Sequence, residues 1–160
     1  MENKILYWLL DSSPNPDLNE ISKWSEKASG LIPVFCFNAK WIKMDDRLSA
    51  ITKSVSQLRS RLIACGSNLL IASGDAEHVI PSLARVLKVK KVVGMIPDTF
   101  HFTNDNEQIM FDVEIVKKTL ESHSIAFIYH HKITTETGTF SNPSLPPFPD
   151  IYPGDLPPIE

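Results

Sequence analysis

The segment between residues 46 and 84 constrains the fold of this chain most, because helix and strand signals alternate within it. In its first half, apolar residues recur at intervals of three and four, which is typical of one buried stripe on an amphipathic helix. These residues are Leu48, Ile51, Val55, Leu58 and Leu62. Gly66 follows the stripe, at a position where the end of a helix favours a positive φ. The spacing therefore predicts a long helix that ends beside Gly66.

The second half of this segment predicts a strand, a tight turn and another helix. Leu69, Leu70 and Ile71 form a short apolar run, which is typical of a strand buried on both faces of a parallel sheet. Gly74 ends this run, and Asp75 stands where it can cap the next helix. A helix, a strand and a second helix in this order indicate a layered α/β arrangement.

The rest of the chain continues the same alternation. Further strands are predicted at residues 5–10, 31–37, 91–96 and 125–129. A first helix is predicted to begin near Asp17 and to end at Gly30. A last helix carries the apolar residues Ile109, Val113, Val116 and Leu120. We therefore predict an α/β fold, in which a five-stranded, mostly parallel, Rossmann-like sheet has helices on both faces.

Composition narrows the class of protein. A length of 160 residues suits one domain, and a net charge of −3 argues against binding of nucleic acid through its phosphates. No apolar run reaches the roughly 18 residues of a membrane span. Cys36 and Cys65 lack CxxC spacing, so we interpret them as buried free thiols, with a disulfide or a metal pair as the alternative. We expect an intracellular, reducing location: the cytoplasm, or a plastid if a transit peptide has been removed.

The end of the chain has a different composition. Residues 142–160 contain seven prolines, which exclude a helix or a central strand there. We therefore predict an α/β domain at residues 1–138 and a Pro-rich tail, or a linker to a further domain, at residues 139–160. A ligand for an SH3-like groove is the alternative. Phe148 and Tyr152 are candidates for packing back on the domain.

Candidate binding residues lie in the loops that follow the strands, because open parallel sheets bind ligands beyond the carboxyl ends of their strands. These loops are residues 11–17, 38–46, 73–77, 97–108 and 130–137. In the first loop, Asp11, Ser12 and Ser13 precede a helix whose N-terminal amides can hold an anion. The loop lacks the glycines of a phosphate-binding motif, so capping and turn formation are the alternative role.

The loop at residues 97–108 carries the other candidate cofactor-binding residues. Phe100 and Phe102 can stack on a flat heterocycle, while Asn106 and Glu107 can hydrogen-bond its edge. The alternative is an irregular loop whose aromatic residues close the core.

The histidines do not predict a metal or catalytic site. His130 and His131 point to opposite faces of a strand and cannot chelate one metal together; we interpret them as hydrogen-bonded surface groups. His78 and His123 are interpreted as helix-surface residues. No GxSxG motif supports a catalytic serine, so no catalytic residue is predicted.

Several short motifs occur in a defined order along residues 4–135. They are Trp8, Asn15-Pro16-Asp17-Leu18, Pro33-Val34-Phe35, Arg47, Gly66-Ser67-Asn68-Leu69, Gly74-Asp75 and Val79-Ile80-Pro81-Ser82-Leu83. In order and spacing they resemble the N-terminal α/β domain of the DNA photolyase and cryptochrome family. The family's first loop usually carries an Arg-x-Asp-Leu-Arg segment, whereas this chain has Leu10-Asp11-Ser12-Ser13 and no arginine. The ionic contacts that the family makes through this loop are therefore not expected here.

The resemblance implies an antenna site. Some members of the family hold a folate, a deazaflavin or a flavin in this domain, and others fill the pocket with side chains. Folate-type members use an Asn-Glu pair, which Asn106 and Glu107 resemble. The FAD, the electron-transfer tryptophans and the lesion pocket of the family lie in a C-terminal helical domain. We therefore expect no FAD site and no DNA repair from these residues alone.

The function we predict is that of a photolyase-like domain without its own catalytic centre. It would act as a binding or regulatory module for an antenna-type chromophore or a nucleotide, and its tail would join it to a further domain. Plant proteins that fuse a photolyase-like region to an α/β-hydrolase would suit such a junction. One alternative is a degenerate structural or protein-interaction module without a cofactor. Another is a fragment of a full photolyase or blue-light photoreceptor.

Overall fold

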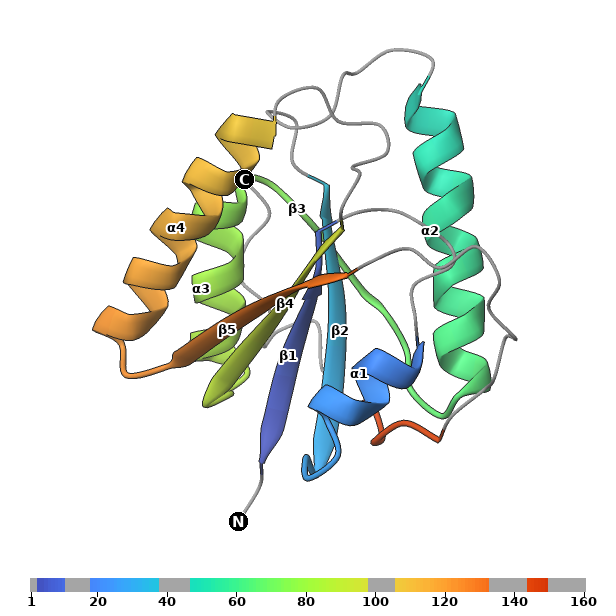
Figure 1. Cartoon of the computed structure of the whole chain (residues 1–160). Helices are drawn as coiled ribbons and strands as arrows, with labels where there is room; N and C mark the ends of the chain where they lie inside the picture. Colours follow the sequence, from blue (N-terminus) through green and yellow to red (C-terminus); the bar gives the residue numbers. More distant parts are fainter. Residues whose placement is uncertain (1–2, 11–17, 38–46, 98–105, 133–143, 150–160) are drawn as a thin grey trace.

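The computed structural model describes residues 3–10, 18–37, 47–97, 106–132 and 144–149 (Figure 1). Strands and helices alternate through these ranges, as the sequence predicts. The elements are β1 (Lys4–Leu9), α1 (Leu18–Trp24), β2 (Gly30–Phe37), α2 (Arg47–Ala64), β3 (Leu70–Ser73), α3 (Ala76–Val86), β4 (Lys91–Pro97), α4 (Asn106–Ser122) and β5 (Ala126–Lys132).

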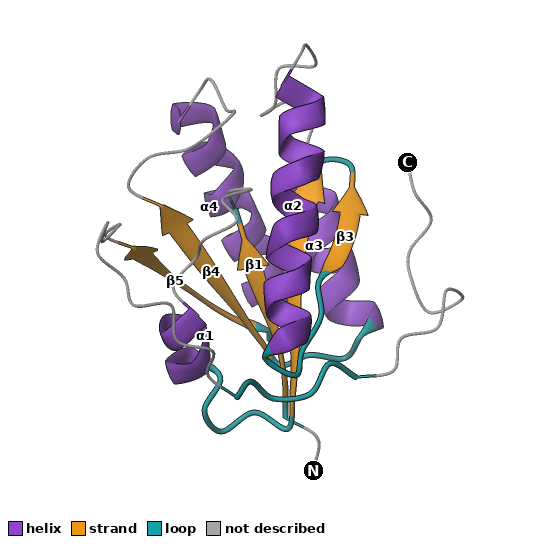
Figure 2. Cartoon of the chain, turned by 90° about the vertical axis from the view of Figure 1, so that its right-hand side faces the viewer, coloured by secondary structure: helices purple, strands orange, loops and turns teal. Residues whose placement is uncertain are grey.

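The strands form one five-stranded sheet in the order β3-β2-β1-β4-β5. Every pair of neighbouring strands is parallel. Helices α1 and α2 lie on one face of this sheet, and α3 and α4 lie on the other (Figures 1 and 2). The predicted α/β fold is confirmed, with a sheet that is parallel throughout. None of the helices in the described ranges is long and apolar enough to cross a membrane.

Helix α2 buries the described part of the stripe that its spacing predicts, whereas the side chain of Leu48 lies outside the described residues. Ile51, Val55, Leu58 and Leu62 are all buried. After the helix, Gly66 has a φ of 91°. The Gly66 N–H donates to the Ile63 carbonyl oxygen, and the Ser67 N–H donates to the Leu62 carbonyl oxygen, both at 3.0 Å. These bonds satisfy carbonyl groups that the end of a helix leaves without partners, which confirms the predicted role of Gly66.

Helices α3 and α4 end in the same way without a glycine. Lys88 has a φ of 57° after α3, and Ser124 has a φ of 60° after α4. The next residues close each helix: Val89 N–H donates to the Ala84 carbonyl oxygen at 3.0 Å, and Ile125 N–H to that of Leu120 at 2.9 Å. Side chains with a Cβ are strained in this left-handed region by about 1–2 kcal/mol per residue. The two helices therefore end in strained residues.

The prediction that the third strand is buried on both faces is wrong. The residues of β3 alternate between half-buried and exposed, and Ile71 is 44% exposed. The strand lies at the edge of the sheet, beside β2 only. Helices cover the centre of a sheet more completely than its edge, so an apolar run alone does not show how deeply a strand lies.

The predicted end of the first helix is also wrong. Helix α1 ends at Trp24, and Gly30 is the first residue of β2. Ser25 follows the helix, and its buried hydroxyl donates to the Ile21 carbonyl oxygen at 2.6 Å. A serine that bonds its own backbone in this way competes with the continuing helix.

Candidate functional site

The order of the strands places a topological switch point between β1 and β4. From β1, the chain adds β2 and β3 on one side and β4 and β5 on the other. Near the carboxyl ends of these strands, Leu9 lies beside Met95, and Met95 lies beside His130. In open parallel sheets, the crevice beyond the strand ends at such a point is where ligands bind.

The strand order therefore brings two of the predicted loops to neighbouring strand ends. Asp11, Ser12 and Ser13 follow β1, whereas Phe100 and Phe102 follow β4; all five lie outside the described residues. Asn106 and Glu107 begin α4, where the side chain of Asn106 also lies outside the description. Glu107 is exposed in the first turn of this helix, where a carboxylate is favourable to the helix dipole.

A polar aromatic cluster, formed by Tyr7, Trp24 and His130, lies beside the switch point. The Tyr7 hydroxyl and His130 Nε2 form a hydrogen bond of 2.7 Å. The indole of Trp24 stacks on the imidazole of His130, with ring centroids 4.8 Å apart and an angle of 11° between the planes. β1, α1 and β5 each contribute one of these rings, so the cluster ties three elements together on the α1 side of the sheet.

Sequence reasoning assigned His130 to the surface and missed its partners. His130 is hydrogen-bonded as expected, but it is half-buried and its partner Tyr7 is fully buried. One signal could have indicated this contact, because a tyrosine in the middle of a central strand needs a partner for its hydroxyl. The side chain of His131 lies outside the described residues.

The opposite face of the sheet carries an apolar aromatic cluster, formed by Trp8, Phe127 and Tyr129. The ring centroids of Trp8 and Phe127 are 6.3 Å apart, and those of Phe127 and Tyr129 are 5.8 Å apart. Gly94 lies beneath them, because a Cβ there would come within 3.2 Å of the Phe127 ring. The Tyr129 hydroxyl donates to Glu114 Oε1 over 3.3 Å. This cluster holds β4 and β5 under α4.

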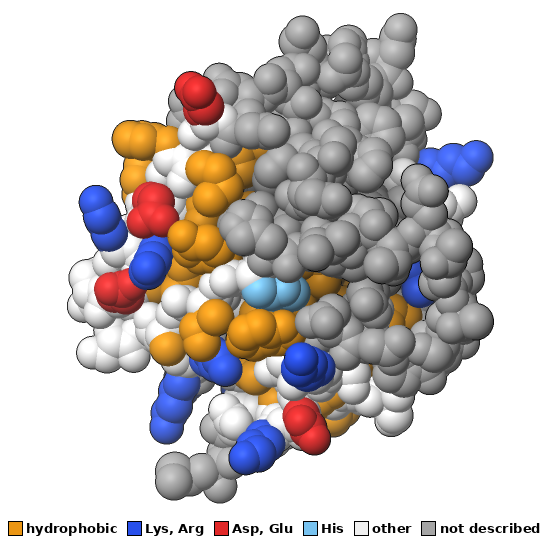
Figure 3. Space-filling view, in the orientation of Figure 1, with side chains coloured by type: hydrophobic (Ala, Val, Ile, Leu, Met, Phe, Trp, Pro, Cys, Tyr) orange, Lys and Arg blue, Asp and Glu red, His pale blue; other side chains and the backbone are white. Residues whose placement is uncertain are grey.

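Hydrophobic side chains also reach the surface near these strands. Phe111 on α4 is 63% exposed, and Ile128 on β5 is 39% exposed. On the face shown in Figure 3, hydrophobic side chains gather over α4 and β5 beside a histidine.

The two cysteines are buried and free, as predicted, and no disulfide joins them. Cys36 lies near the carboxyl end of β2, and its thiol donates to the Gly74 carbonyl oxygen (3.3 Å). Burial, followed by the nearby carboxylates of Asp75 and Glu77, raises the pKa of the Cys36 thiol to about 12. Burial also raises the pKa of Cys65. Thiols that stay protonated at neutral pH are poor nucleophiles and poor metal ligands.

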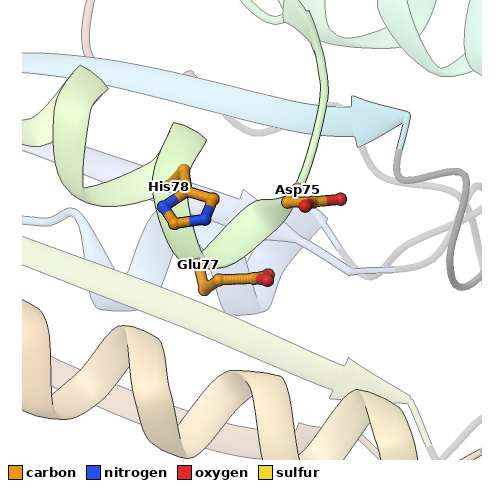
Figure 4. Close-up of side chains that lie close together, drawn as sticks. All are labelled: Asp75, Glu77 and His78. Atoms are coloured by element: carbon orange, nitrogen blue, oxygen red, sulfur yellow. The ribbon is translucent and has the colours of Figure 1, made fainter. Parts of the chain in front are cut away.

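Among the described residues, Asp75, Glu77 and His78 form a group with ligand atoms within 4.8 Å of one another. Asp75 lies at the N-cap of α3 as predicted, but its side chain makes no capping hydrogen bond. In the close-up, the two carboxylates point away from the ring of His78 (Figure 4). A metal ion here would also meet the positive end of the α3 dipole. We therefore interpret the two carboxylates as groups that favour the start of α3.

A polar groove of about 310 Å³ lies between α3 and α4. The lining residues are Glu77, His78, Pro81, Ser82, Arg85, Thr119 and His123. His78 is exposed on α3, which confirms that it is a helix-surface residue; His123 is exposed too, but it lies in the turn after α4. The groove is a second place where a small ligand could be held, on the face of the sheet opposite α1.

Comparison with known proteins agrees with this architecture. A family model described as DNA photolyase matches residues 14–143. The chain therefore belongs to the DNA photolyase family, as its motifs indicated. A search of curated proteins finds no match.

Solved structures with a similar fold are photolyases and a cryptochrome. The cryptochrome of Synechocystis is 16% identical, with a TM-score of 0.62 over 82% of this chain. An archaeal photolyase from Sulfolobus tokodaii is 18% identical, with a TM-score of 0.63 over 79% of the chain. A class III photolyase from Agrobacterium tumefaciens is 18% identical, with a TM-score of 0.62 over 82% of the chain.

The similarity concerns one part of these proteins. This chain covers 28%, 29% and 26% of the length of the three chains, respectively. It has the fold of the photolyase and cryptochrome N-terminal domain. At these identities the structural likeness concerns the fold alone.

Proposed function

We propose that this domain is a non-catalytic binding module, which holds a flat chromophore of the antenna type, or a nucleotide, at the switch point between β1 and β4. The observation that carries this proposal is the strand order, which makes the ends of β1 and β4 neighbours. In the chain, Asp11, Ser12 and Ser13 come shortly after the end of β1, and Phe100 and Phe102 come shortly after the end of β4.

The chemistry of these residues suits a flat, partly polar ligand. Phenyl rings stack on heterocycles, and hydroxyl, carboxamide and carboxylate groups bond to their edges. Asn106 and Glu107 continue the set at the start of α4, which follows β4 in the chain. The archaeal photolyase from Sulfolobus tokodaii is described with two FAD molecules and with the implication of a novel light-harvesting cofactor. A second flavin in that relative makes flavins the first class of ligand to test.

The test is a titration of the purified chain with FMN, FAD, a deazaflavin, methenyltetrahydrofolate and ATP. Absorption and fluorescence report binding, and calorimetry gives the stoichiometry. We expect one of these compounds to bind saturably at one site per chain. The Phe102→Ala variant should weaken binding by about tenfold, since a stacked ring contributes about 1–1.5 kcal/mol. The Glu107→Gln variant should weaken it less.

Glu121→Gln is the matched control, because Glu121 is an exposed residue in the last turn of the same helix. It should bind as the unmodified chain does. If none of the five compounds binds, the domain is better described as a structural or protein-interaction module. Binding that resists Phe102→Ala but is lost in His123→Ala would move the ligand to the groove between α3 and α4.

A further inference from the structure

The described part of the tail, residues 144–149, lies against the domain at the end opposite the switch point. In Figure 1 it passes below α1 and beside the end of α2, near the amino ends of the strands. Leu145 is only 5% exposed and belongs to the hydrophobic core, and Phe148 is half-buried against that core. The expectation that Phe148 packs back on the domain is confirmed; Tyr152 lies outside the described residues.

The tail meets the sheet where one strand is missing a neighbour. Strand β2 pairs with β1 from Gly30 onwards, but it pairs with β3 only from Val34 onwards. The first residues of β2 therefore have no strand on the β3 side. There the Leu31 N–H donates to the Pro147 carbonyl oxygen at 3.0 Å. The tail thus extends the hydrogen bonding of the sheet beyond the start of β3.

The sequence of β2 suits this arrangement. Alternate residues of a strand point their N–H groups to the same side, so Leu31 and Pro33 share the side that β3 leaves open. Proline has no N–H, so Pro33 leaves no donor without a partner there. A single acceptor, the Pro147 carbonyl, therefore satisfies the N–H donor that these two residues present on this side.

A second contact holds the tail to the end of α2. The Leu145 N–H donates to the Cys65 carbonyl oxygen at 2.9 Å. Pro146, Pro147 and Pro149 have no N–H. The tail therefore bonds to the domain through the Leu145 N–H and the Pro147 carbonyl oxygen. Gly30 also lies at this surface, since a Cβ there would be 3.5 Å from the Pro147 oxygen, in ordinary van der Waals contact with the tail.

We propose that Gly30, Leu31, Cys65 and Gly66 form a tail-docking surface, which recognises an extended Leu-Pro-Pro-Phe segment and is occupied by residues 144–149 of the same chain. Leu145 is the apolar anchor. The Leu31 N–H donates a hydrogen bond to the backbone of the segment, and the Cys65 carbonyl oxygen accepts one from it. Pro-rich segments suit this type of recognition, because their extended form is largely preformed and loses little entropy on binding.

The proposal concerns the opposite end of the sheet from the chromophore site and does not depend on that site. It makes residues 144–149 part of the folded domain, whereas the sequence predicts a domain limit at residue 138. A segment that follows the tail would then leave the domain from its amino-end surface, away from the switch point.

Amide hydrogen exchange in the intact chain tests the docking directly, with the Leu31 N–H as the reporter. The Leu145→Asp variant places a charge in a buried apolar position and should release the tail. We expect exchange at Leu31 to become faster by about tenfold or more, with little change at amides in the middle of α4. Ser144→Asp is the matched control, because it adds the same charge at an exposed neighbouring position.

A second experiment separates docking from general loss of stability. A protease site is inserted after residue 138, the chain is cut, and the products are separated by gel filtration. We expect the tail fragment to stay bound to a monomeric domain and to be displaced by a labelled peptide of residues 142–151. The same peptide with Leu145→Asp should bind about tenfold more weakly or worse.

Three results would overturn the proposal. In the first, Leu31 stays protected in the Leu145→Asp chain. In the second, the cut tail separates from a domain that keeps its melting temperature. In the third, the uncut chain is a dimer in which the tail docks on the partner copy.

Discussion

The two faces of the sheet bury their aromatic side chains in different surroundings, and two neighbouring residues of β1 show the difference. Tyr7 and Trp8 are both fully buried and point to opposite faces, because side chains alternate along a strand. Tyr7 enters a polar aromatic cluster, where its hydroxyl bonds to His130. Trp8 enters an apolar one, where it packs on Phe127. Equal burial therefore occurs in different surroundings: Tyr7 lies against a hydrogen-bonded imidazole, whereas Trp8 lies against a phenyl ring.

The helical layers differ in a second respect. On the α2 side, the left-handed residue after the helix is Gly66, whereas on the other side it is Lys88 after α3 and Ser124 after α4. The same hydrogen-bond pattern closes all three helices. The α3 and α4 layer therefore has more room for stabilisation by substitution than the α2 layer has.

The largest effect is expected from Trp8→Ala, because it removes the biggest side chain of the apolar cluster. Truncation of a buried aromatic residue costs about 3–5 kcal/mol, which urea unfolding followed by far-UV circular dichroism would measure. Phe111→Ala is the control, because Phe111 is an exposed aromatic residue on α4. It should change the free energy of unfolding by less than about 0.5 kcal/mol. Equal losses in both variants would contradict the assignment of Trp8 to the core.

The next largest effect is a dependence of the free energy of unfolding on pH. It arises from Cys36, which lies on the same side of the sheet as Trp8. The folded state holds the Cys36 proton up to a pKa of about 12, from an ordinary value of 9.0. Between these values the folded chain binds more protons than the unfolded chain, so stability falls as pH rises, by at most about 1.4 kcal/mol per pH unit. Below pH 9.0 this contribution is fully present.

Urea unfolding of the chain and of its Cys36→Ala variant, at pH values on both sides of 9.0, would isolate this contribution. The variant should lose the part of the slope that Cys36 causes. The rise in the pKa of Cys65 remains in both proteins and cancels in the comparison. Identical slopes would show that the thiol of Cys36 is not held protonated by its surroundings.

A smaller effect is expected in the polar aromatic cluster. Tyr7→Phe keeps the ring and removes the hydroxyl, so His130 Nε2 loses this hydrogen bond at a cost of about 1 kcal/mol. Tyr129→Phe is the matched variant on the other face, where the hydroxyl bond to Glu114 is longer, at 3.3 Å against 2.7 Å. It should cost less than Tyr7→Phe in the same unfolding experiment. The reverse order would show that the hydroxyl of Tyr7 contributes little.

The smallest expected effect is an increase in the free energy of unfolding. Lys88→Gly and Ser124→Gly each remove a Cβ from a left-handed position and should raise the free energy of unfolding by about 0.5–1 kcal/mol. Gly66→Ala makes the opposite change on the α2 side and should lower it by a similar amount. Thermal unfolding of the three variants checks the signs. A loss of stability in Lys88→Gly would mean that the freedom glycine adds to the unfolded chain outweighs the relief of strain.

Local patterns predicted much of this fold and little of the candidate site. The stripes of α2 and α4 and the turn at Gly66 depend on residues a few positions apart, so they were visible in the sequence. The contact between Tyr7 and His130 joins residues 123 positions apart, and no periodicity connects them. The loops with the candidate binding residues were found from the general behaviour of parallel sheets. Their chemistry, unlike their attachment to neighbouring strands, stays a prediction.

The errors have the same origin. The apolar run in β3 predicts a strand buried on both faces, but composition carries no information about an edge position. The prolines of the tail excluded a helix and a central strand, but they did not reveal that the Pro147 carbonyl accepts the Leu31 N–H on the open side of β2.

The sequence by itself determined the alternation of strands and helices, the buried face of the long helices and the glycine that ends α2. Only the tertiary structure decided the strand order, the edge position of β3, the partners of Tyr7 and the docking of the tail. The physical reason is the separation along the chain over which each interaction acts. Helix and turn preferences act over a few residues, whereas the strand order, the pairing of a buried hydroxyl and the closure of an open strand depend on segments that meet only when the whole chain has folded.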